Sequence, residues 1–391
     1  MTLPRFLQIH TLHNYPAALL NRDDAGLAKR LPYGDKVRTR ISSQCLKRHW
    51  RVADDAFALK NLDVPMAIRS REVPRLIRDR LVAAGVAEPL AQMAVEGLRA
   101  AGLVDKAKDL KGKDALETGQ AVLLGQAEID YLVRRCSEVA AQHGEEKALK
   151  AAIADFLKDE KKNIEAMRLG SGLESALFGR MVTSDVLASR DAAVYVAHAF
   201  TVHEAQVEND YFTVVDDLLR EAGETGSAGI FDTELASGLY YGYVVIDVPQ
   251  LVVNLDGTIQ DWSAATPEQR ALAGRVVQHL LHLIATVSPG AKRGSTAPFE
   301  WAKFMLVEAG DWQPRSLAGA FQNALPQNQP ALRKAAVQRI ADEIAQMDAA
   351  YGAPLARRFL AVDDVQVPGA ERLPLKALAE WAQGAVTRAE V

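Results

Sequence analysis

The fold is first indicated by the segment RFLQIHTLH, residues 5–13, close to the start of the sequence. Apolar and polar side chains alternate along it, with Leu7 and Ile9 on one side and Gln8 and His10 on the other. A period of two is typical of a β-strand with one buried face. The sequence therefore predicts that the chain starts with a half-buried strand.

A basic segment follows this strand after a loop. Between residues 29 and 51 there are eight basic residues and one acid, Asp35; the basic residues are Lys29, Arg30, Lys36, Arg38, Arg40, Lys47, Arg48 and Arg51. The whole chain, by contrast, has a formal net charge of −4. A concentrated basic surface on a mildly acidic protein suits a polyanion held in one groove, and it does not suit general adhesion to nucleic acid.

From Ser42 the period becomes helical. The apolar positions of this expected helix are Leu46, Trp50, Ala53 and Phe57, and the polar ones are Gln44, Lys47, Arg48 and Arg51. Either Ser42 or Ser43 can cap the helix, which leaves backbone N–H groups at its start pointing outward. Such a helix end surrounded by cations binds phosphate without reading base identity. The alternative explanation is a solvated helix face.

The remainder of the chain predicts an α+β protein. Helical patterns are expected over 74–84, 89–101, 125–143 and 145–167, and a mobile, lysine-bearing loop over 105–114. Strand patterns return at 239–248 and 304–309, with a helix at 267–287 between them. We expect a sheet covered on one face by helices, with a helical insertion in the first half of the chain.

Composition excludes several classes of protein. No apolar run approaches the ~20 residues of a membrane helix, and the first residues do not form a secretion signal, so a cytoplasmic protein without a membrane partner is expected. Two cysteines give neither a disulfide framework nor a thiolate metal cage. His279 and His282 have helical spacing without a carboxylate or cysteine partner, so they are expected on a helix surface. No phosphate-binding loop is found, and neither a metal nor a cofactor is expected.

Several longer motifs resemble one family. NRDD (21–24) and RTRISSQCLKR (38–48) are similar to the N-terminal signature of the backbone subunit of the type I-E CRISPR Cascade complex, the CasC family. The resemblance continues in the same order along the chain, through LFGRMVTSD (177–185), YVAHAFTVHEAQVENDYFTVVDDL (195–218), SGLYYGYVVIDV (237–248) and PGAKRGSTAPF (289–299). It covers nearly the whole chain, and it is weakest in the helical insertion.

The resemblance implies a non-catalytic, hand-shaped protein. Its palm is expected to have an RNA-recognition-motif-like (ferredoxin-like) fold and to come from residues 1–60 and 176–391, with helical fingers at 61–175 and a protruding thumb at about 203–235. Copies of the protein are expected to polymerise along CRISPR RNA and to displace single nucleotides at regular intervals. The other nucleotides would pair with target DNA. The implied partners also include the large, small and RNA end-capping Cascade subunits.

The resemblance and the charge pattern together predict the RNA-binding residues. By motif, the residues expected to line the RNA backbone are Arg22, Ser43, Gln44, Lys47 and Arg51, and charge alone adds Lys29 and Arg40. Met181 matches a residue that packs against the displaced nucleotide, and Thr213 matches its partner on the neighbouring copy. Lys292, with Arg293 beside it, lies on a Pro-Gly turn that can contact phosphate or simply be a basic surface turn.

Two other functions remain open at the level of sequence. A CRISPR RNA endonuclease of related fold would use His10, His13 or His49 as a general base, because RNA cleavage needs no metal if a histidine and a cation flank the phosphate. A transcription regulator would place the basic helix in a DNA groove. The long helical insertion and the lack of a helix–turn–helix pair argue against this third function.

Overall fold

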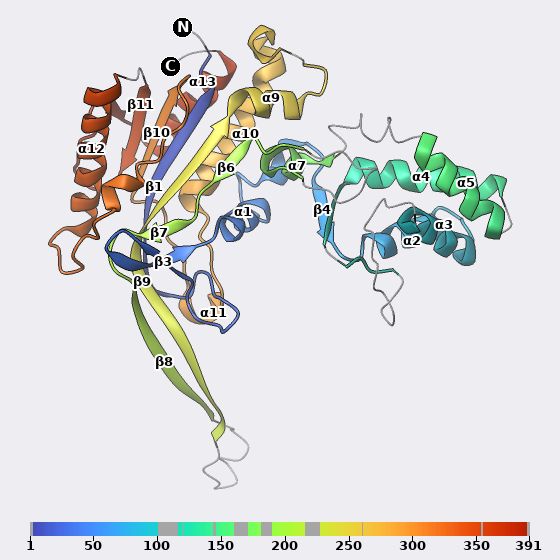
Figure 1. Ribbon diagram of the computed structural model, residues 1–391, viewed down its shortest axis with the longest axis horizontal. Helices are drawn as coiled ribbons and strands as arrows, with labels where there is room; N and C mark the ends of the chain where they lie inside the picture. Colours follow the sequence, from blue (N-terminus) through green and yellow to red (C-terminus); the bar gives the residue numbers. More distant parts are fainter. Residues whose placement is uncertain are drawn as a thin grey trace. The chain divides into compact units, whose positions relative to one another are not determined.

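The computed structural model of the chain describes residues 3–100, 116–119, 121–143, 146–159, 171–180, 190–215, 227–259, 261–352 and 355–388 (Figure 1). The chain divides into two compact units. The first, which we call the sheet unit, comprises Met1–Leu59, Tyr195–Ile246 and Gly274–Val391. The second, the helical unit, comprises Lys60–Val194 and Asp247–Ala273.

Ten strands of the described residues form one mixed sheet, in the order β12-β11-β10-β1-β9-β7-β3-β2, with β6 and β8 also paired to β9. Their bounds are β1 Phe6–Ala18, β2 Arg30–Tyr33, β3 Lys36–Ile41, β6 Val194–Val196, β7 Ala199–Thr201, β8 Gln206–Val215, β9 Ser227–Asp247, β10 Phe304–Gly310, β11 Ala356–Ala361 and β12 Ala370–Arg372. The predicted strands at 5–13, 239–248 and 304–309 correspond to β1, β9 and β10, so the α+β class is confirmed.

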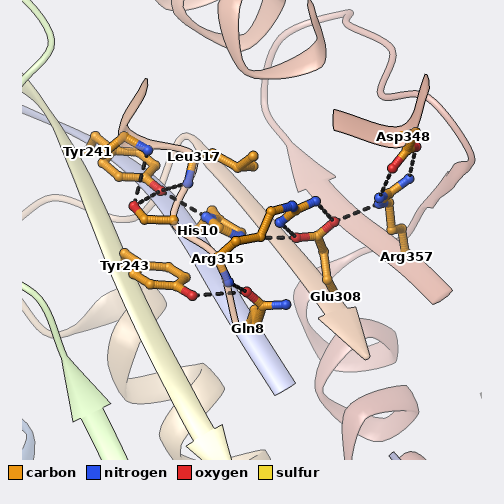
Figure 2. A network of polar contacts seen from close by, with 11 residues as sticks. Gln8, His10, Tyr241, Tyr243, Glu308, Arg315, Leu317, Asp348 and Arg357 are labelled. Atoms are coloured by element: carbon orange, nitrogen blue, oxygen red, sulfur yellow. Dashed lines mark hydrogen bonds and ion pairs between the residues drawn. The ribbon is translucent and has the colours of Figure 1, made fainter. Parts of the chain in front are cut away.

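The first strand differs from the prediction in one respect, because both of its faces are buried. Leu7 and Ile9 are fully buried, and so is His10, while Gln8 is 2% exposed. The polar side chains tolerate burial because they are hydrogen-bonded within a network on one face of the sheet (Figure 2). Burial without such partners would cost several kcal/mol.

Glu308 on β10 lies at the centre of this network. Its carboxylate accepts hydrogen bonds from His10 Nε2 at 3.2 Å, from both terminal nitrogens of Arg315 at 2.6 and 2.9 Å, and from Arg357 Nε at 2.6 Å. Burial by itself would raise the pKa of Glu308, but the hydrogen bonds from His10 and Arg315 outweigh it and hold the pKa far below its usual value. The network therefore holds β1, β10 and β11 together as a structural core.

Helices cover both faces of the sheet, whereas we predicted one covered face. The helix α12 (Leu332–Tyr351) packs in a cluster with Leu306 and Phe359. The helix α13 (Leu375–Thr387) contacts β10 and β11. Because Met305 and Val307 alternate with Leu306 and are also fully buried, the opposite face of β10 is covered as well.

The part of the basic segment before α1 (Ser43–Arg51) forms a β-hairpin, for which we predicted no strand. Strand β2 pairs antiparallel with β3 from Arg30–Thr39 to Tyr33–Lys36. Gly34 in the turn has a φ of +60°, and a Cβ atom there would lie 1.6 Å from the carbonyl oxygen of Gln322. Only glycine fits both this conformation and this close approach.

The helix α1 ends at Arg51, so Phe57 does not belong to its apolar face as predicted. Instead, Phe57 stacks flat on His282 of α10 (Pro267–Thr286), with ring centroids 3.5 Å apart. His279 donates from Nδ1 to the carbonyl oxygen of Phe57 at 3.0 Å. The prediction that His279 and His282 lie on a solvated helix surface is therefore wrong for His282, which is buried against Phe57.

The helical unit contains α2, α3, α4 and α5, which correspond to the four helical patterns predicted in the first half of the chain, and also α7 and α9, which were not predicted. Their bounds are α2 Val73–Ala83, α3 Glu88–Ala100, α4 Gln126–Gln142, α5 Glu146–Asp159, α7 Leu173–Phe178 and α9 Val248–Leu255. A strand pair, β4 (Ala67–Ser70) with β5 (Val122–Gly125), was not predicted. The predicted limits of the insertion, 61–175, stay a prediction, and its lysine-bearing loop at 105–114 lies outside the described residues.

No helix in the described part of the chain has the length and apolar character needed to cross a membrane.

Candidate nucleic-acid interface

The helix α1 begins with a side-chain cap. The Oγ atom of Ser42 accepts a hydrogen bond from the backbone N–H of Cys45 at 3.3 Å. This confirms the predicted cap and assigns it to Ser42, since Ser43 is the first residue of the helix and is buried. The capped start of α1 carries the partial positive charge of the helix dipole.

The loop that contains the NRDD motif is fixed next to this helix start. The side-chain oxygen of Asn21 accepts from the backbone N–H of Ser42 at 2.9 Å. Asp23 accepts from the backbone N–H groups of Ala25 and Leu27 at 3.0 and 2.9 Å. Arg22 lies exposed between these two anchoring residues.

Three cations act electrostatically on Cys45, which lies in the first turn of α1. Burial raises the pKa of the Cys45 thiol, and the charges of Arg48, Lys29 and Arg293 oppose that shift. Arg48 lies three residues after Cys45 in the last turn of α1, and the turn that carries Arg293 is joined to the segment before Asn21 by the hydrogen bond from the N–H of Ala291 to the carbonyl oxygen of Leu19 at 2.8 Å. Among the residues that the structure describes, the side chains of Lys29 and Arg48 make no hydrogen bond or ion pair.

Arg40 extends this group of cations at the end of β3. Its Nη1 donates to Nδ1 of His198 at 3.0 Å, and its Nε donates to the carbonyl oxygen of Arg30 at 3.2 Å. Burial lowers the pKa of His198, and the charges of Arg40 and Lys29 lower it further. Lys29 is next to Arg40, because the backbone N–H of Arg40 donates to the carbonyl oxygen of Lys29 at 2.8 Å. We call Lys29, Arg40, Arg48 and Arg293 the basic cluster.

The polar face of α1 is only partly open to solvent. Gln44 and Arg48 are exposed, whereas Lys47 and Arg51 are half-buried. Burial lowers the pKa of Lys47. Among the predicted RNA-binding residues of this helix, Gln44 is thus the most accessible, and Arg48, which was not predicted to bind RNA, is exposed as well.

Other basic residues of the 29–51 segment are used within the protein. Arg30 forms an ion pair with Glu234 of β9, and Lys36 forms one with Glu204 at 3.2 Å. Arg38 is fully buried and donates to the carbonyl oxygens of Thr201 and Phe321 at 3.1 and 3.0 Å; it also lies 3.4 Å from Asp35. Fewer cations are therefore available to a ligand than the eight basic residues of the 29–51 segment suggest.

The Pro-Gly turn meets the same surface. Lys292 is exposed, has a φ of +50°, and donates from Nζ to the hydroxyl oxygen of Thr233 on β9. Arg293 donates to the carbonyl oxygen of Ser288 at 3.3 Å. The structure thus brings the turn to the base of the hairpin formed by β8 and β9, which extends from the sheet in Figure 1.

The predicted pair at the displaced nucleotide is described only in part. Met181 lies outside the described residues. Thr213 lies on β8 opposite Ile230 of β9, and its side chain is not described. Immediately before Met181, Gly179 has a φ of +78°, and Arg180 forms a buried ion pair with Glu128 at 2.7 Å. The interpretation of Met181 and Thr213 therefore stays a prediction.

The three histidines considered as catalytic bases are poorly placed for that role. His10 is fully buried, and His49 is buried with its Nδ1 donating to the carbonyl oxygen of Cys45 at 2.8 Å. His13 is half-buried by accessible area, and burial lowers its pKa to about 4. Within the described ranges, no group of three histidine, cysteine or acidic side chains is arranged to hold a metal ion.

Three residues of this surface were not identified from the sequence: Asn21, His198 and Glu234. Asn21 and His198 lie inside the NRDD and AHAFTVH motifs, so the motifs were a signal for their location. Their partners, however, are distant in sequence. Glu234 is an acid in a surface expected to be basic, and nothing in the local sequence indicates it.

A profile of CT1975-like proteins matches residues 7–383. This chain belongs to the family of CT1975-like Cas proteins. A comparison with curated protein sequences gives no match. Among solved structures, this CT1975-like protein is similar to a chain of a "CRISPR RNA-guided surveillance complex, pre-nicking", with 26% identity, a TM-score of 0.77, and coverage of 97% of this chain and 100% of that chain. A chain of a second "CRISPR RNA-guided surveillance complex" has the same fold, with 21% identity, a TM-score of 0.55, and coverage of 96% and 98%.

Proposed function

We propose that this protein is a CRISPR RNA-binding backbone subunit of a type I-E surveillance complex and that it does not cleave RNA. Copies of the chain would line the guide RNA, displace nucleotides at regular intervals and present the others to target DNA. The large, small and end-capping subunits would complete the complex. Membership of the CT1975-like Cas family and the likeness to a chain of a surveillance complex support this proposal.

The observation that carries the proposal is the basic cluster at the capped start of α1. Lys29, Arg40 and Arg48 come from the basic segment and Arg293 from a distant turn, and a backbone hydrogen bond of 2.8 Å joins Arg40 to Lys29 beside the strand that leads into α1. Cations beside a capped helix attract phosphate, and contacts to phosphate carry no sequence information. It therefore suits a guide whose sequence varies.

The strand order supports an RNA-recognition-motif-like palm. The neighbouring strands β10-β1-β9-β7 have the sequence order fourth, first, third, second, with α1 following β1 and α10 following β9. This is the order of the ferredoxin-like split βαβ motif. On this basis the helical unit corresponds to the fingers, and the β8–β9 hairpin corresponds to the thumb.

The test is RNA binding by the purified chain, measured as dissociation constants for several unrelated single strands across a salt series. Binding should be sequence-tolerant, and its logarithm should fall with the logarithm of salt concentration, because phosphate contacts release counterions. Arg48→Glu should weaken binding by about tenfold or more and reduce the slope by about 0.7 per lost contact. A strong preference for one sequence, or binding without a salt slope, would contradict the proposal.

A matched control for Arg48→Glu is Lys376→Glu on α13, which makes the same change of charge at a side chain that is 83% exposed. If both substitutions weaken RNA binding equally, the effect is one of net charge and the basic cluster is not the binding surface. Co-expression of the chain with a CRISPR array, followed by sequencing of any co-purified RNA, tests whether the bound RNA is a guide.

A further inference from the structure

An acidic side chain lies among the cations of this surface. Glu234 of β9 is 5% exposed. One carboxylate oxygen accepts from the backbone N–H of Ala28 at 2.8 Å, and the other is paired with the guanidinium of Arg30. An anion lowers the affinity of a surface for phosphate, so its presence at this place needs a reason other than charge.

The contacts of Glu234 indicate what that reason is. Ala28 closes the loop that begins at Asn21, since Ala28 bridges to Arg22 and the N–H of Lys29 donates to the carbonyl oxygen of Asn21 at 2.9 Å. This loop carries Arg22 at its start and leads directly into Lys29. A hydrogen bond to the buried Ala28 N–H therefore fixes the backbone between two of the predicted RNA-binding side chains.

Other contacts tie the same place to the base of the β8–β9 hairpin. Ala28 packs with Leu19, Ala236 and Ala291 in a small buried cluster. The N–H of Ala291 donates to the carbonyl oxygen of Leu19 at 2.8 Å, and Lys292 donates to Thr233. The strand residues 233–236 thus contact both loops that carry cations of the surface.

We propose that Glu234 is a positioning residue for the phosphate-binding surface, acting through its hydrogen bond to the Ala28 N–H. It couples the base of the β8–β9 hairpin to the loop that holds Arg22 and Lys29. This inference rests on the proposed function, because it names a residue that organises the same surface. Charge alone predicts that loss of the acid strengthens RNA binding, whereas this inference predicts that binding is unchanged as long as an acceptor for the Ala28 N–H remains.

Two conservative variants separate these explanations. Glu234→Gln loses the charge but keeps an oxygen that accepts from Ala28, whereas Glu234→Asp keeps the charge but is one methylene too short to maintain both contacts. The charge control is Asp232→Asn, which lies on the same face of β9 and is exposed. RNA dissociation constants across a salt series, thermal melting, and hydrogen exchange at the Ala28 amide are measured for all four proteins.

We expect Glu234→Gln and Asp232→Asn to bind RNA within about twofold of the wild type. Glu234→Asp should bind roughly tenfold more weakly, with a smaller salt slope because fewer phosphates are contacted. The Ala28 amide should exchange faster in Glu234→Asp than in the wild type and in Glu234→Gln. A salt slope that changes while the melting temperature does not would distinguish positioning from general loss of stability.

Wild-type affinity in Glu234→Asp would overturn the inference, and so would a tenfold loss in Glu234→Gln. If Glu234→Asp unfolds at the assay temperature, a tenfold loss of affinity in Glu234→Gln with unchanged exchange at the Ala28 amide still overturns the inference. A wild-type chain that binds no RNA in a salt-dependent manner contradicts the proposed function itself, whatever the variants of Glu234 do.

Discussion

The guanidinium group of Arg40 donates a hydrogen bond to Nδ1 of His198 across 3.0 Å. This contact requires an unprotonated Nδ1, and the lowered pKa of His198 favours that state. Arg40 lies near the end of β3, and His198 lies directly before β7. The exposed imidazole therefore sets the direction of a cation that we expect to contact phosphate.

Replacement of either member of this pair should weaken RNA binding. Arg40→Ala should raise the dissociation constant roughly tenfold, which is about 1.4 kcal/mol. His198→Ala should raise it less, and His198→Asn should restore part of the loss because an amide oxygen also accepts a hydrogen bond. In a double-mutant cycle, adding His198→Ala to Arg40→Ala should raise the dissociation constant little further, because His198 is expected to affect RNA binding only through the Arg40 guanidinium. Fully additive losses would mean that the two side chains act independently.

Arg38 and Arg40 are two residues apart on β3. Substitution of Arg38 should lower the stability of the protein and leave RNA binding unchanged, whereas substitution of Arg40 should weaken RNA binding and leave stability unchanged. Arg38→Met removes donors from the buried carbonyl oxygens of Thr201 and Phe321, so the free energy of unfolding should fall by about 2–4 kcal/mol. Below its melting temperature, the variant should still bind RNA like the wild type. Arg40→Met, the matched control, should leave stability within about 0.5 kcal/mol and weaken RNA binding. Denaturant unfolding and RNA titration of both variants check this prediction.

Stability should fall as the solution is acidified below pH 6.5. Burial lowers the pKa of His13 from its ordinary 6.5 to about 4, so between these values the unfolded chain binds a proton that the folded chain does not. The free energy of unfolding therefore rises with pH across this window, by at most roughly 3 kcal/mol for this one group. The pKa values of further histidines are lowered as well and act in the same direction; they are His10, His49, His198, His203 and His282.

The contribution of His13 can be isolated by His13→Phe. The aromatic ring preserves the stacking on Tyr15, whose centroid lies 6.0 Å away, but it removes the titrating group. Urea unfolding at a series of pH values should give a smaller change between pH 6.5 and 4 for the variant than for the wild type. Identical pH dependence in the two proteins would show that His13 does not take up this proton.

The predicted role of Met181 and Thr213 is tested by the regularity of bound RNA. If these side chains of adjacent copies hold a displaced nucleotide, chemical probing of assembled RNA should show reactivity at a fixed interval. Met181→Ala should blur this pattern, and assembly should persist, because loss of stacking on one base is worth roughly 1–3 kcal/mol and the phosphate contacts remain. Uniform protection of the RNA in the wild-type assembly would mean that no nucleotide is displaced and that Met181 does not have this role.

Several of the larger elements followed from local patterns. The period-two segment at 5–13, the serine-capped start of α1 and the helical patterns of the first half of the chain were recognised because they depend on neighbouring residues. The elements that were missed are of two kinds. The strands β2 and β3 were not recognised because they are rich in charge, and α12, β11, β12 and α13 were not predicted, although the helical spacing of Val337, Ile340 and Ile344 was a local signal for α12.

The sequence by itself determined that a basic segment and a capped helix lie next to each other, since both occur within residues 29–51. Only the tertiary structure decided which cations remain accessible. Arg38 turns inward because its guanidinium can satisfy two buried carbonyl oxygens, Arg30 is paired with Glu234, and Arg293 joins the surface from more than two hundred residues away. Contacts of this kind join segments that are distant in sequence and meet only in the folded sheet. The local spacing of apolar and polar residues therefore cannot predict them.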